Sequence, residues 1–170
     1  DVTVALTMGY AFADSLWSAF FDKDDHWATS FVLYAETMSL NFALTSLTKL
    51  AFRRPRPIAY IELRETGVPS TDTDASLSFY SGHTSTAAGI MSTASYLAFK
   101  RHGLRSWKPW VTVVLGAAVT SLVAVQRVRA REHFPTDVLV GAIVGSSVGI
   151  LVPHLHAAKE HRGCRFSLAH

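Results

Sequence analysis

The sequence of 170 residues contains one cysteine, Cys164, and few charged residues. A single cysteine excludes an internal disulfide, a thiolate metal cluster and a disulfide framework. Charged residues make up 17% of the chain, below the roughly 25% of a soluble globular domain. Hydrophobic residues make up 49%, so the composition also excludes a disordered chain, a collagen-like repeat and an acidic tail.

Positive charge exceeds negative charge only slightly, with 16 lysine and arginine residues against 13 aspartate and glutamate residues. A nucleic-acid-binding protein usually carries a denser basic stripe on one face, so we expect no nucleic-acid partner. The length predicts that residues 1–170 form a single domain. Because the chain begins at Asp1, we expect a processed chain or an excised domain, with a missing upstream transmembrane helix as one alternative.

Long segments with almost no charge recur along the chain. Each contains at most one charged side chain, and they cover Val2–Phe21, Ala28–Thr48, Thr84–Phe99, Trp107–Gln126 and Val138–Ala158. A surface helix of a soluble protein has a charged face, whereas these segments are apolar or small-polar all round, as in lipid. A chain of this length cannot bury so many apolar helices inside protein. The pattern therefore predicts an all-α, multi-helix bundle embedded in a membrane.

Glycines in the last of these segments follow a regular spacing. Gly141, Gly145 and Gly149 are four residues apart and share one helical face. This spacing permits close approach of a neighbouring helix. Chance spacing in a glycine-rich helix is the alternative.

The longest polar stretch runs from Lys49 to Tyr80. It contains three prolines, and Ser70–Ser78 is rich in serine, threonine and aspartate. These residue types favour turns and interrupt helices. We expect loop and turn throughout this stretch.

A first polar cluster lies at the start of this stretch. Lys49 is followed by Arg53, Arg54 and Arg56, the last two each preceding a proline. Such cations can bind a phosphate, or they can interact with the helix dipole and the membrane surface. The residues of this cluster alone leave both interpretations open.

A second cluster lies where the loop ends and an uncharged segment begins. Ser81 is an N-cap candidate, and Gly82 lets the backbone approach a ligand. The free N–H groups of a first helical turn bind anions, and His83 follows directly. Helix capping alone would also explain the serine and the glycine.

A third cluster contains Arg127, His133 and Asp137. The histidine and the aspartate are four residues apart and can share a helical face. A carboxylate that binds one ring nitrogen fixes the tautomer and leaves the other nitrogen available as a nucleophile or base. A surface histidine beside a capping aspartate is the alternative.

The three clusters together supply what phosphoryl transfer requires. Its transition state needs fixed cations around the equatorial oxygens, a nucleophile, and an acid for the leaving group. Lys49, Arg56 and Arg127 would supply the cations. His133 would supply the nucleophile and His83 the acid.

These clusters resemble the motifs of the type 2 phosphatidic acid phosphatase (PAP2) superfamily, which includes vanadium haloperoxidases. Three family motifs recur with their spacing: Lys49 and Arg56-Pro57 with six residues between them, Ser81-Gly82-His83, and Arg127, His133 and Asp137 with five and three residues between them. Tyr80 and Gln126 stand where the family has proline and serine. Arg54-Pro55 has the wrong spacing from Lys49, so Arg54 is the weaker candidate for the first motif.

The resemblance implies a membrane phosphatase that needs no metal and no cofactor, with vanadate able to bind as a phosphate mimic. It implies that His133 attacks phosphorus to form a phosphohistidine, that Asp137 holds the tautomer of His133, and that His83 protonates the leaving oxygen. The phosphate-binding residues implied by the resemblance are Lys49, Arg56, Ser81, the N–H group of Gly82, and Arg127.

Charge placement predicts the orientation in the membrane. Two apolar segments separate the second cluster from the third, so the clusters converge at one membrane face. Basic residues outside them gather in one loop and in the tail: Lys100, Arg101, Arg105, Lys108, Lys159, Arg162 and Arg165. By the positive-inside rule these regions are cytoplasmic, so the expected multi-pass protein has its site on the periplasmic or extracytoplasmic side. A lipid phosphate or an isoprenyl pyrophosphate is the expected substrate.

Two other functions are compatible with the residues. One is a vanadate-dependent haloperoxidase, although the short and apolar chain argues against it. The other is a catalytically weak protein that binds lipid head groups, which the departures at Tyr80 and Gln126 leave open. The sequence predicts neither the particular lipid nor the oligomeric state.

Overall fold

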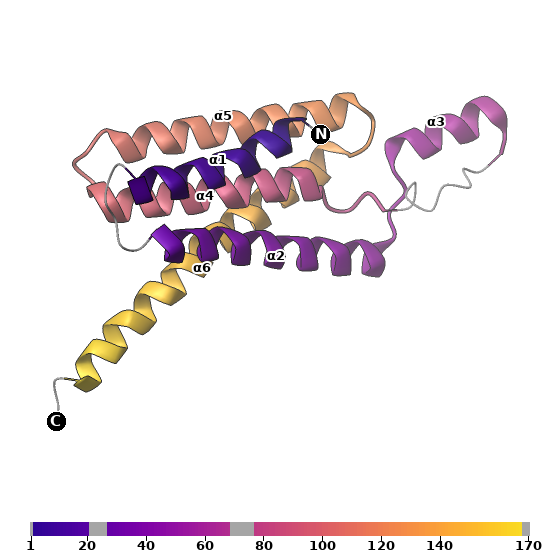
Figure 1. The fold of residues 1–170 in the computed structure, drawn as a ribbon. Helices are drawn as coiled ribbons and strands as arrows, with labels where there is room; N and C mark the ends of the chain where they lie inside the picture. Colours follow the sequence, from indigo (N-terminus) through magenta and orange to yellow (C-terminus); the bar gives the residue numbers. More distant parts are fainter. Residues whose placement is uncertain (1, 21–26, 69–76, 168–170) are drawn as a thin grey trace.

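The computed structural model describes the backbone of residues 2–20, 27–68 and 77–167, with side chains except at 17–20 and 158–167. The described residues form helices and no strand, which confirms the expected all-α fold. The helices are α1 (Val2–Phe20), α2 (Trp27–Phe52), α3 (Pro57–Thr66), α4 (Gly82–His102), α5 (Lys108–Arg129) and α6 (Pro135–Ser167) (Figure 1).

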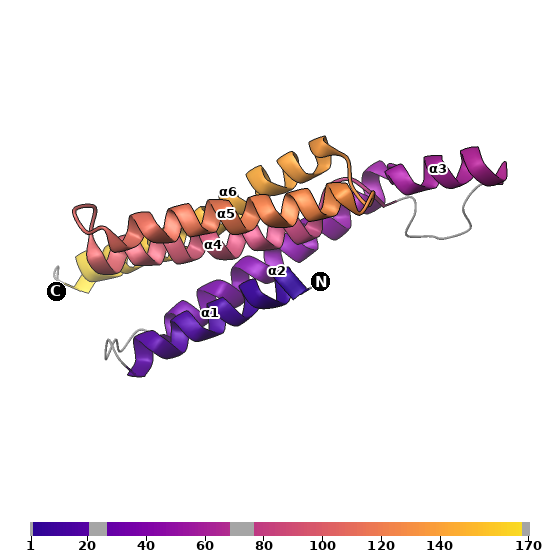
Figure 2. The same cartoon turned by 90° about the horizontal axis from the view of Figure 1, so that it is seen from above.

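Helix α4 lies at the centre of the bundle. It contacts α1, α2, α5 and α6, and the two views of the ribbon show these helices around it (Figures 1 and 2). Ala87, Ile90 and Thr93 on α4 have no exposed surface. Because most side chains of α4 are small, its neighbours can pack closely against its backbone.

The glycines of α6 provide the closest of these approaches. A Cβ atom at Gly141 would lie 2.6 Å from the carbonyl oxygen of Ser81, and one at Gly145 would overlap the carbonyl oxygen of Ser85. Gly149 approaches the α4 backbone as closely. The predicted close packing is therefore confirmed, and it fixes the start of α6 against the start of α4.

Buried polar side chains also join the helices. The hydroxyl of Ser85 on α4 donates to Oδ1 of Asn41 on α2 at 2.7 Å. The hydroxyl of Thr93 donates to the carbonyl oxygen of Gly149 on α6 at 3.0 Å and lies 3.1 Å from the hydroxyl of Thr37 on α2. Interhelical hydrogen bonds of this kind stabilise helix packing in an apolar solvent.

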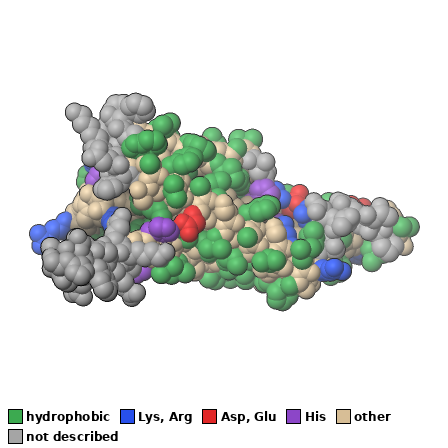
Figure 3. Space-filling model, turned by 60° about the horizontal axis from the view of Figure 1, so that its bottom comes forward, with side chains coloured by type: hydrophobic (Ala, Val, Ile, Leu, Met, Phe, Trp, Pro, Cys, Tyr) green, Lys and Arg blue, Asp and Glu red, His purple; other side chains and the backbone are tan. Residues whose placement is uncertain are grey.

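The outer surface of the bundle is apolar. Large hydrophobic side chains such as Val114 on α5 and Ile143 on α6 are exposed, and hydrophobic side chains cover much of the face in Figure 3. Within the described residues, α5 and the Pro135–Ala157 part of α6 are long and apolar enough to cross a membrane. Helices α2 and α4, also expected to lie in the membrane, are richer in serine and threonine.

Helix α3 is a correction to the sequence prediction. Loop was expected throughout Lys49–Tyr80, yet Pro57–Thr66 forms a helix that projects beyond the bundle (Figure 2). Proline at the first position of a helix removes an N–H group that has no partner there, so Pro57 begins this helix instead of preventing it. Gly67, with φ of 70°, ends it. Most of the predicted turn at Ser70–Ser78 lies outside the described residues.

The connections at one end of the bundle are joined by backbone hydrogen bonds. Three such bonds link segments far apart in the sequence: Ile58 N to Arg131 O at 3.1 Å, Ser78 N to Arg54 O at 2.8 Å, and Ser81 N to Asp137 O at 3.1 Å. Arg53 and Arg131 have positive φ angles of 41° and 57° and lie in the connections that follow α2 and α5. The three predicted clusters therefore meet at this end.

Candidate active site

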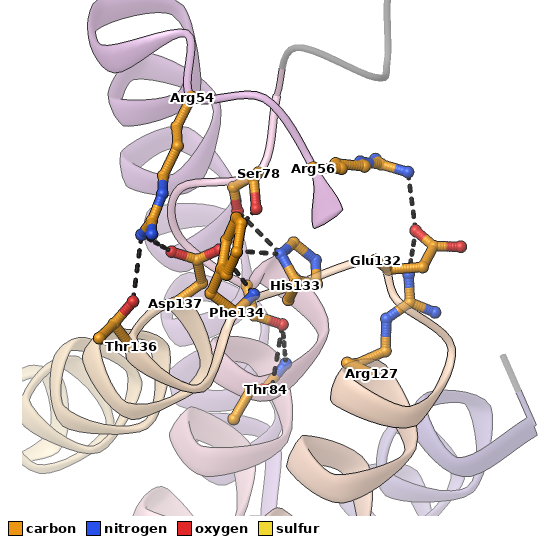
Figure 4. A network of polar contacts seen from close by, with 11 residues as sticks. Arg54, Arg56, Ser78, Thr84, Arg127, Glu132, His133, Phe134, Thr136 and Asp137 are labelled. Atoms are coloured by element: carbon orange, nitrogen blue, oxygen red, sulfur yellow. Dashed lines mark hydrogen bonds and ion pairs between the residues drawn. The ribbon is translucent and has the colours of Figure 1, made fainter. Parts of the chain in front are cut away.

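His133 lies buried where the clusters meet, with 2% of its surface exposed. Its Nδ1 atom is 2.8 Å from the carbonyl oxygen of Ser78 (Figure 4). A carbonyl oxygen only accepts hydrogen bonds, so Nδ1 carries the hydrogen and Nε2 carries the lone pair. This tautomer leaves Nε2 available as a nucleophile.

Asp137 does not contact His133 in the way that the sequence suggested. Its Oδ2 atom lies 3.9 Å from Nδ1 of His133, too far for a hydrogen bond. Oδ2 accepts hydrogen bonds from the hydroxyl of Ser78 and, at 3.0 Å, from the backbone N–H of Phe134. The reason is local: Asp137 is the third residue of α6 and caps it by reaching back to Phe134. Asp137 is thus connected to His133 through Ser78.

The two Arg-Pro pairs have different partners. Nη1 of Arg54 donates to Oδ1 of Asp137 at 2.7 Å and to the hydroxyl of Thr136 at 3.1 Å. Its guanidinium group also lies over the ring of Phe134, 4.2 Å from the centroid. Arg56 instead points to the opposite side of His133 (Figure 4). This division supports assigning Arg56, and not Arg54, to phosphate binding.

Arg56 and Arg127 converge on one carboxylate. Nη1 of Arg56 lies 2.7 Å from Oε2 of Glu132, and Nη2 of Arg127 lies 2.9 Å from the same oxygen. Both arginine side chains are mostly buried, with 17% and 12% of their surface exposed. The two predicted phosphate-binding arginines are therefore held side by side, next to His133.

The second cluster forms the start of α4. Ser81 is the N-cap of this helix, as expected, because its side-chain oxygen accepts a hydrogen bond from the N–H of Thr84 at 3.4 Å. Ser81 is fully buried. The N–H groups of Gly82 and His83 are in the first turn, where a helix provides no acceptor, so they suit an anion.

A cavity of about 290 Å³ lies beside this helix start. Lys49, in the last turn of α2, lines it together with Gly82 and His83. Apolar walls come from α1 and α2 and include Met8 and Phe42. The lining of the cavity therefore combines the cation of Lys49 with apolar side chains.

A family model described as "PAP2 superfamily" matches residues 30–160. The chain belongs to the PAP2 superfamily. One relative is a lipid A 1-phosphatase of Porphyromonas gingivalis, 33% identical over 129 residues that cover 76% of this chain. The chain spans only 24% of the length of that relative. The expected enzyme class, a PAP2-type phosphatase, is that of this relative.

Two solved structures resemble this PAP2 protein. A transmembrane PAP2-type phosphatidylglycerolphosphate phosphatase from Bacillus subtilis matches with a TM-score of 0.68 and 22% identity, over 92% of this chain and 74% of that chain. LpxE from Aquifex aeolicus matches with a TM-score of 0.58 and 25% identity, over 89% and 81% of the respective chains. With the two apolar helices, these likenesses confirm the helical PAP2 fold and a membrane protein.

The surroundings of the two site histidines of this PAP2 protein lower their pKa values. Burial, followed by the nearby charge of Lys49, lowers the pKa of His133 to about 4, although the hydrogen bond to Ser78 opposes this shift. Burial and then the charge of Arg127 lower the pKa of His83 to about 4. Both imidazoles are therefore neutral in the empty site at neutral pH. A bound phosphate dianion would oppose the cations and favour a proton on His83.

Sequence reasoning missed two residues of this PAP2 site, Ser78 and Glu132, and did not predict the role of Arg54. Ser78 carries no signal, because it sits in a stretch of serine, threonine and aspartate residues and acts partly through its backbone. Arg54 was considered only as an alternative to Arg56. Glu132 did carry a signal, as an acidic residue directly before His133 in a basic run.

Proposed function

We propose that this chain is an integral-membrane phosphatase that hydrolyses a lipid phosphate or pyrophosphate monoester through a phosphohistidine on His133. The hydrogen bond from Nδ1 of His133 to the carbonyl oxygen of Ser78 is the observation that carries the proposal. It leaves the nucleophilic Nε2 atom beside the cations of Arg56 and Arg127. These cations and Lys49 supply the positive charge of the reaction, so we propose that it needs no metal and no cofactor.

The first step is an in-line displacement at phosphorus. Nε2 of His133 forms a bond to phosphorus while the bond from phosphorus to the ester oxygen breaks. Lys49, Arg56 and Arg127 stabilise the charge on the equatorial oxygens. The first-turn N–H group of Gly82 adds a neutral donor, and Ser81 holds that turn in place.

His83 handles the proton of both steps. The phosphate dianion raises the pKa of His83 from its low value in the empty site, so that the imidazole binds a proton and gives it to the leaving oxygen. Neutral His83 then takes a proton from a water molecule. This water attacks phosphorus, breaks its bond to Nε2 of His133, and releases inorganic phosphate.

The cavity beside α4 supports a lipid substrate. Its polar lining at Lys49, Gly82 and His83 suits a phosphate, and its apolar walls at Met8 and Phe42 suit the part of the lipid next to the head group. The named relatives are phosphatases of lipid A and of phosphatidylglycerolphosphate. We propose a lipid phosphate or an isoprenyl pyrophosphate as the substrate class.

The positions of basic residues support a multi-pass orientation with the site outside the cytoplasm. Basic residues gather at the end of α4, in the connection to α5 and at the start of α5: Lys100, Arg101, Arg105 and Lys108. This region lies at the other end of the bundle from the start of α4 (Figure 1). Basic connections of membrane helices favour the cytoplasm. The site then faces the periplasm or the extracytoplasmic side.

A substrate panel tests this proposal. Purified protein in detergent is mixed with phosphatidic acid, phosphatidylglycerolphosphate, lipid A and an isoprenyl pyrophosphate, and phosphate release is measured. We expect release from at least one lipid, and its loss in a folded His133→Ala variant. Lipid binding without release would favour the head-group binding protein. Bromide oxidation that requires added vanadate would favour the haloperoxidase.

A further inference from the structure

Glu132 occupies the position between the two arginines of the site. Its single Oε2 atom accepts hydrogen bonds from Nη1 of Arg56 at 2.7 Å and from Nη2 of Arg127 at 2.9 Å (Figure 4). An oxygen bridging two guanidinium groups is the contact that a phosphoryl oxygen would make with the same pair. The carboxylate therefore takes donors that the proposed reaction assigns to phosphate.

We propose that Glu132 is a specificity-determining residue, an internal anion that binds Arg56 and Arg127 in the empty site and is displaced by the phosphoryl group of the substrate. This inference rests on the proposed function, because it takes the arginine pair as the phosphate site. A carboxylate and a phosphate dianion repel each other at one pair of cations. The carboxylate is the group that moves, because the partly exposed side chain of Glu132 can rotate away from the arginines while the phosphate binds in its place.

The partial exposure of the Glu132 side chain allows phosphate to displace it from the two arginines. The side chain of Glu132 is 32% exposed, so its charge can move into solvent without being buried and unpaired. Arg56 and Arg127 are less exposed and stay in place. The displacement thus moves one flexible side chain and leaves the cations where the reaction uses them.

Competition between Glu132 and the phosphoryl group favours substrates that also bind the protein through another part of the molecule. Inorganic phosphate and other small anions make only the polar contacts of the phosphate site, so they must displace Glu132 with no gain from apolar burial. A lipid phosphate also gains from burial of its apolar part in the cavity of Met8 and Phe42. Glu132 would therefore weaken the binding of small anions more than the binding of lipid phosphates. It would also assist release of the phosphate product.

A purely structural role for Glu132 predicts the opposite sign. If the carboxylate served only to hold the arginines apart and in position, removing its charge would leave them misplaced. Phosphate would then bind more weakly. The direction of the change in phosphate affinity separates the two roles.

The test is calorimetric titration of inorganic phosphate into detergent-purified protein, comparing wild type with Glu132→Gln and Glu132→Ala. Glu65→Gln is the matched control, because it removes the same charge from an exposed position on α3. We expect the Kd for phosphate to fall by roughly three- to tenfold in both Glu132 variants and to stay unchanged in the control. The melting temperature with and without phosphate confirms that each variant is folded and reports the same affinity change.

An unchanged or larger Kd in the folded Glu132 variants would overturn the inference. Because phosphate binding needs no turnover, this result is independent of whether any lipid is hydrolysed. If wild type releases no phosphate from any lipid but the variants bind phosphate more tightly, the proposed function fails and the competition at the arginine pair stands. If a lipid is hydrolysed, the KM for that lipid should fall less in Glu132→Gln than the inhibition constant of phosphate.

Discussion

Nδ1 of His133 donates its hydrogen bond to the backbone carbonyl of Ser78, 2.8 Å away. The tautomer of the proposed nucleophile is therefore set by main chain. The carboxylate of Asp137 acts on His133 only indirectly, because it binds the hydroxyl of Ser78 and the guanidinium group of Arg54. Asp137 is a positioning residue for His133 in this arrangement.

Asp137→Asn should lower kcat with little change in KM. The amide is a weaker acceptor for Arg54 and Ser78, so the Ser78 carbonyl and the imidazole of His133 lose their fixed position. Misplacement of a reacting group by about 1 Å reduces rates by about 100-fold, so we expect a loss of roughly 10- to 100-fold. Steady-state kinetics on a hydrolysed lipid phosphate measure both constants, with Glu65→Gln on the exposed face of α3 as the control.

A double-mutant cycle with Ser78→Ala checks the route from Asp137 to His133. Ser78→Ala removes the hydroxyl but keeps the carbonyl that binds Nδ1. If Asp137 acts through that hydroxyl, the double variant should lose little more activity than Asp137→Asn alone. Additive losses would show that Asp137 acts on His133 by another route.

Arg54→Ala and Arg56→Ala should affect different kinetic constants. Arg54 binds Asp137, so its loss should reduce kcat by misplacing His133. Arg56 belongs to the proposed phosphate site, and removing a charge-assisted hydrogen bond of about 1.5–3 kcal/mol should raise KM by roughly 10- to 100-fold. A KM effect of Arg54→Ala equal to that of Arg56→Ala would contradict the division between the two arginines.

Stability of the ligand-free protein should fall as the pH is lowered from 6.5 towards 4. The pKa values of His83 and His133 are about 4 in the folded protein, against 6.5 as the ordinary value. Between these values the unfolded chain binds protons that the folded chain does not, so acid favours unfolding. Melting temperatures in detergent measure the slope. A His83→Gln/His133→Gln variant should have a flatter profile, and an equal slope would show that other groups cause it.

Gly145→Ala should destabilise the bundle although alanine favours helix. The added Cβ atom would overlap the Ser85 carbonyl and push α6 away from α4. Gly9→Ala is the matched control, because a Cβ atom on that helical glycine meets nothing within 4 Å. There the gain in helix propensity, up to about 1 kcal/mol, should leave stability equal or higher. Equal melting temperatures for the two variants would contradict the close α4–α6 contact.

The sequence was most informative where chemistry depends on side-chain type and spacing. The low charge of the apolar segments predicted the five helices of the bundle, and the spacing of the glycines predicted the α4–α6 contact. The two apolar segments between the second and third clusters also predicted that Lys49, Arg127 and His133 would lie at one end of the bundle, as they do.

Two kinds of feature could not be predicted from the sequence. Helix α3 was missed because Pro57 was taken as a helix breaker, whereas at the first position of a helix it is favourable. The partner of His133 was missed because a backbone carbonyl has no sequence signature, and because Asp137 lies close enough in sequence to suggest direct contact. Such relationships depend on loop conformation, which the loop residues themselves do not specify.

The central claim is that Nε2 of His133 becomes covalently phosphorylated. The most direct test is to mix the protein with a hydrolysed lipid phosphate, quench the reaction within milliseconds at alkaline pH, and locate the phosphoryl group by mass spectrometry. We predict an acid-labile phosphoryl group on His133 that is absent from His133→Ala and persists longer in His83→Ala, where the water is no longer activated. Lipid turnover with no phosphoryl group on His133 at any time, or with the group on another residue, would contradict the account.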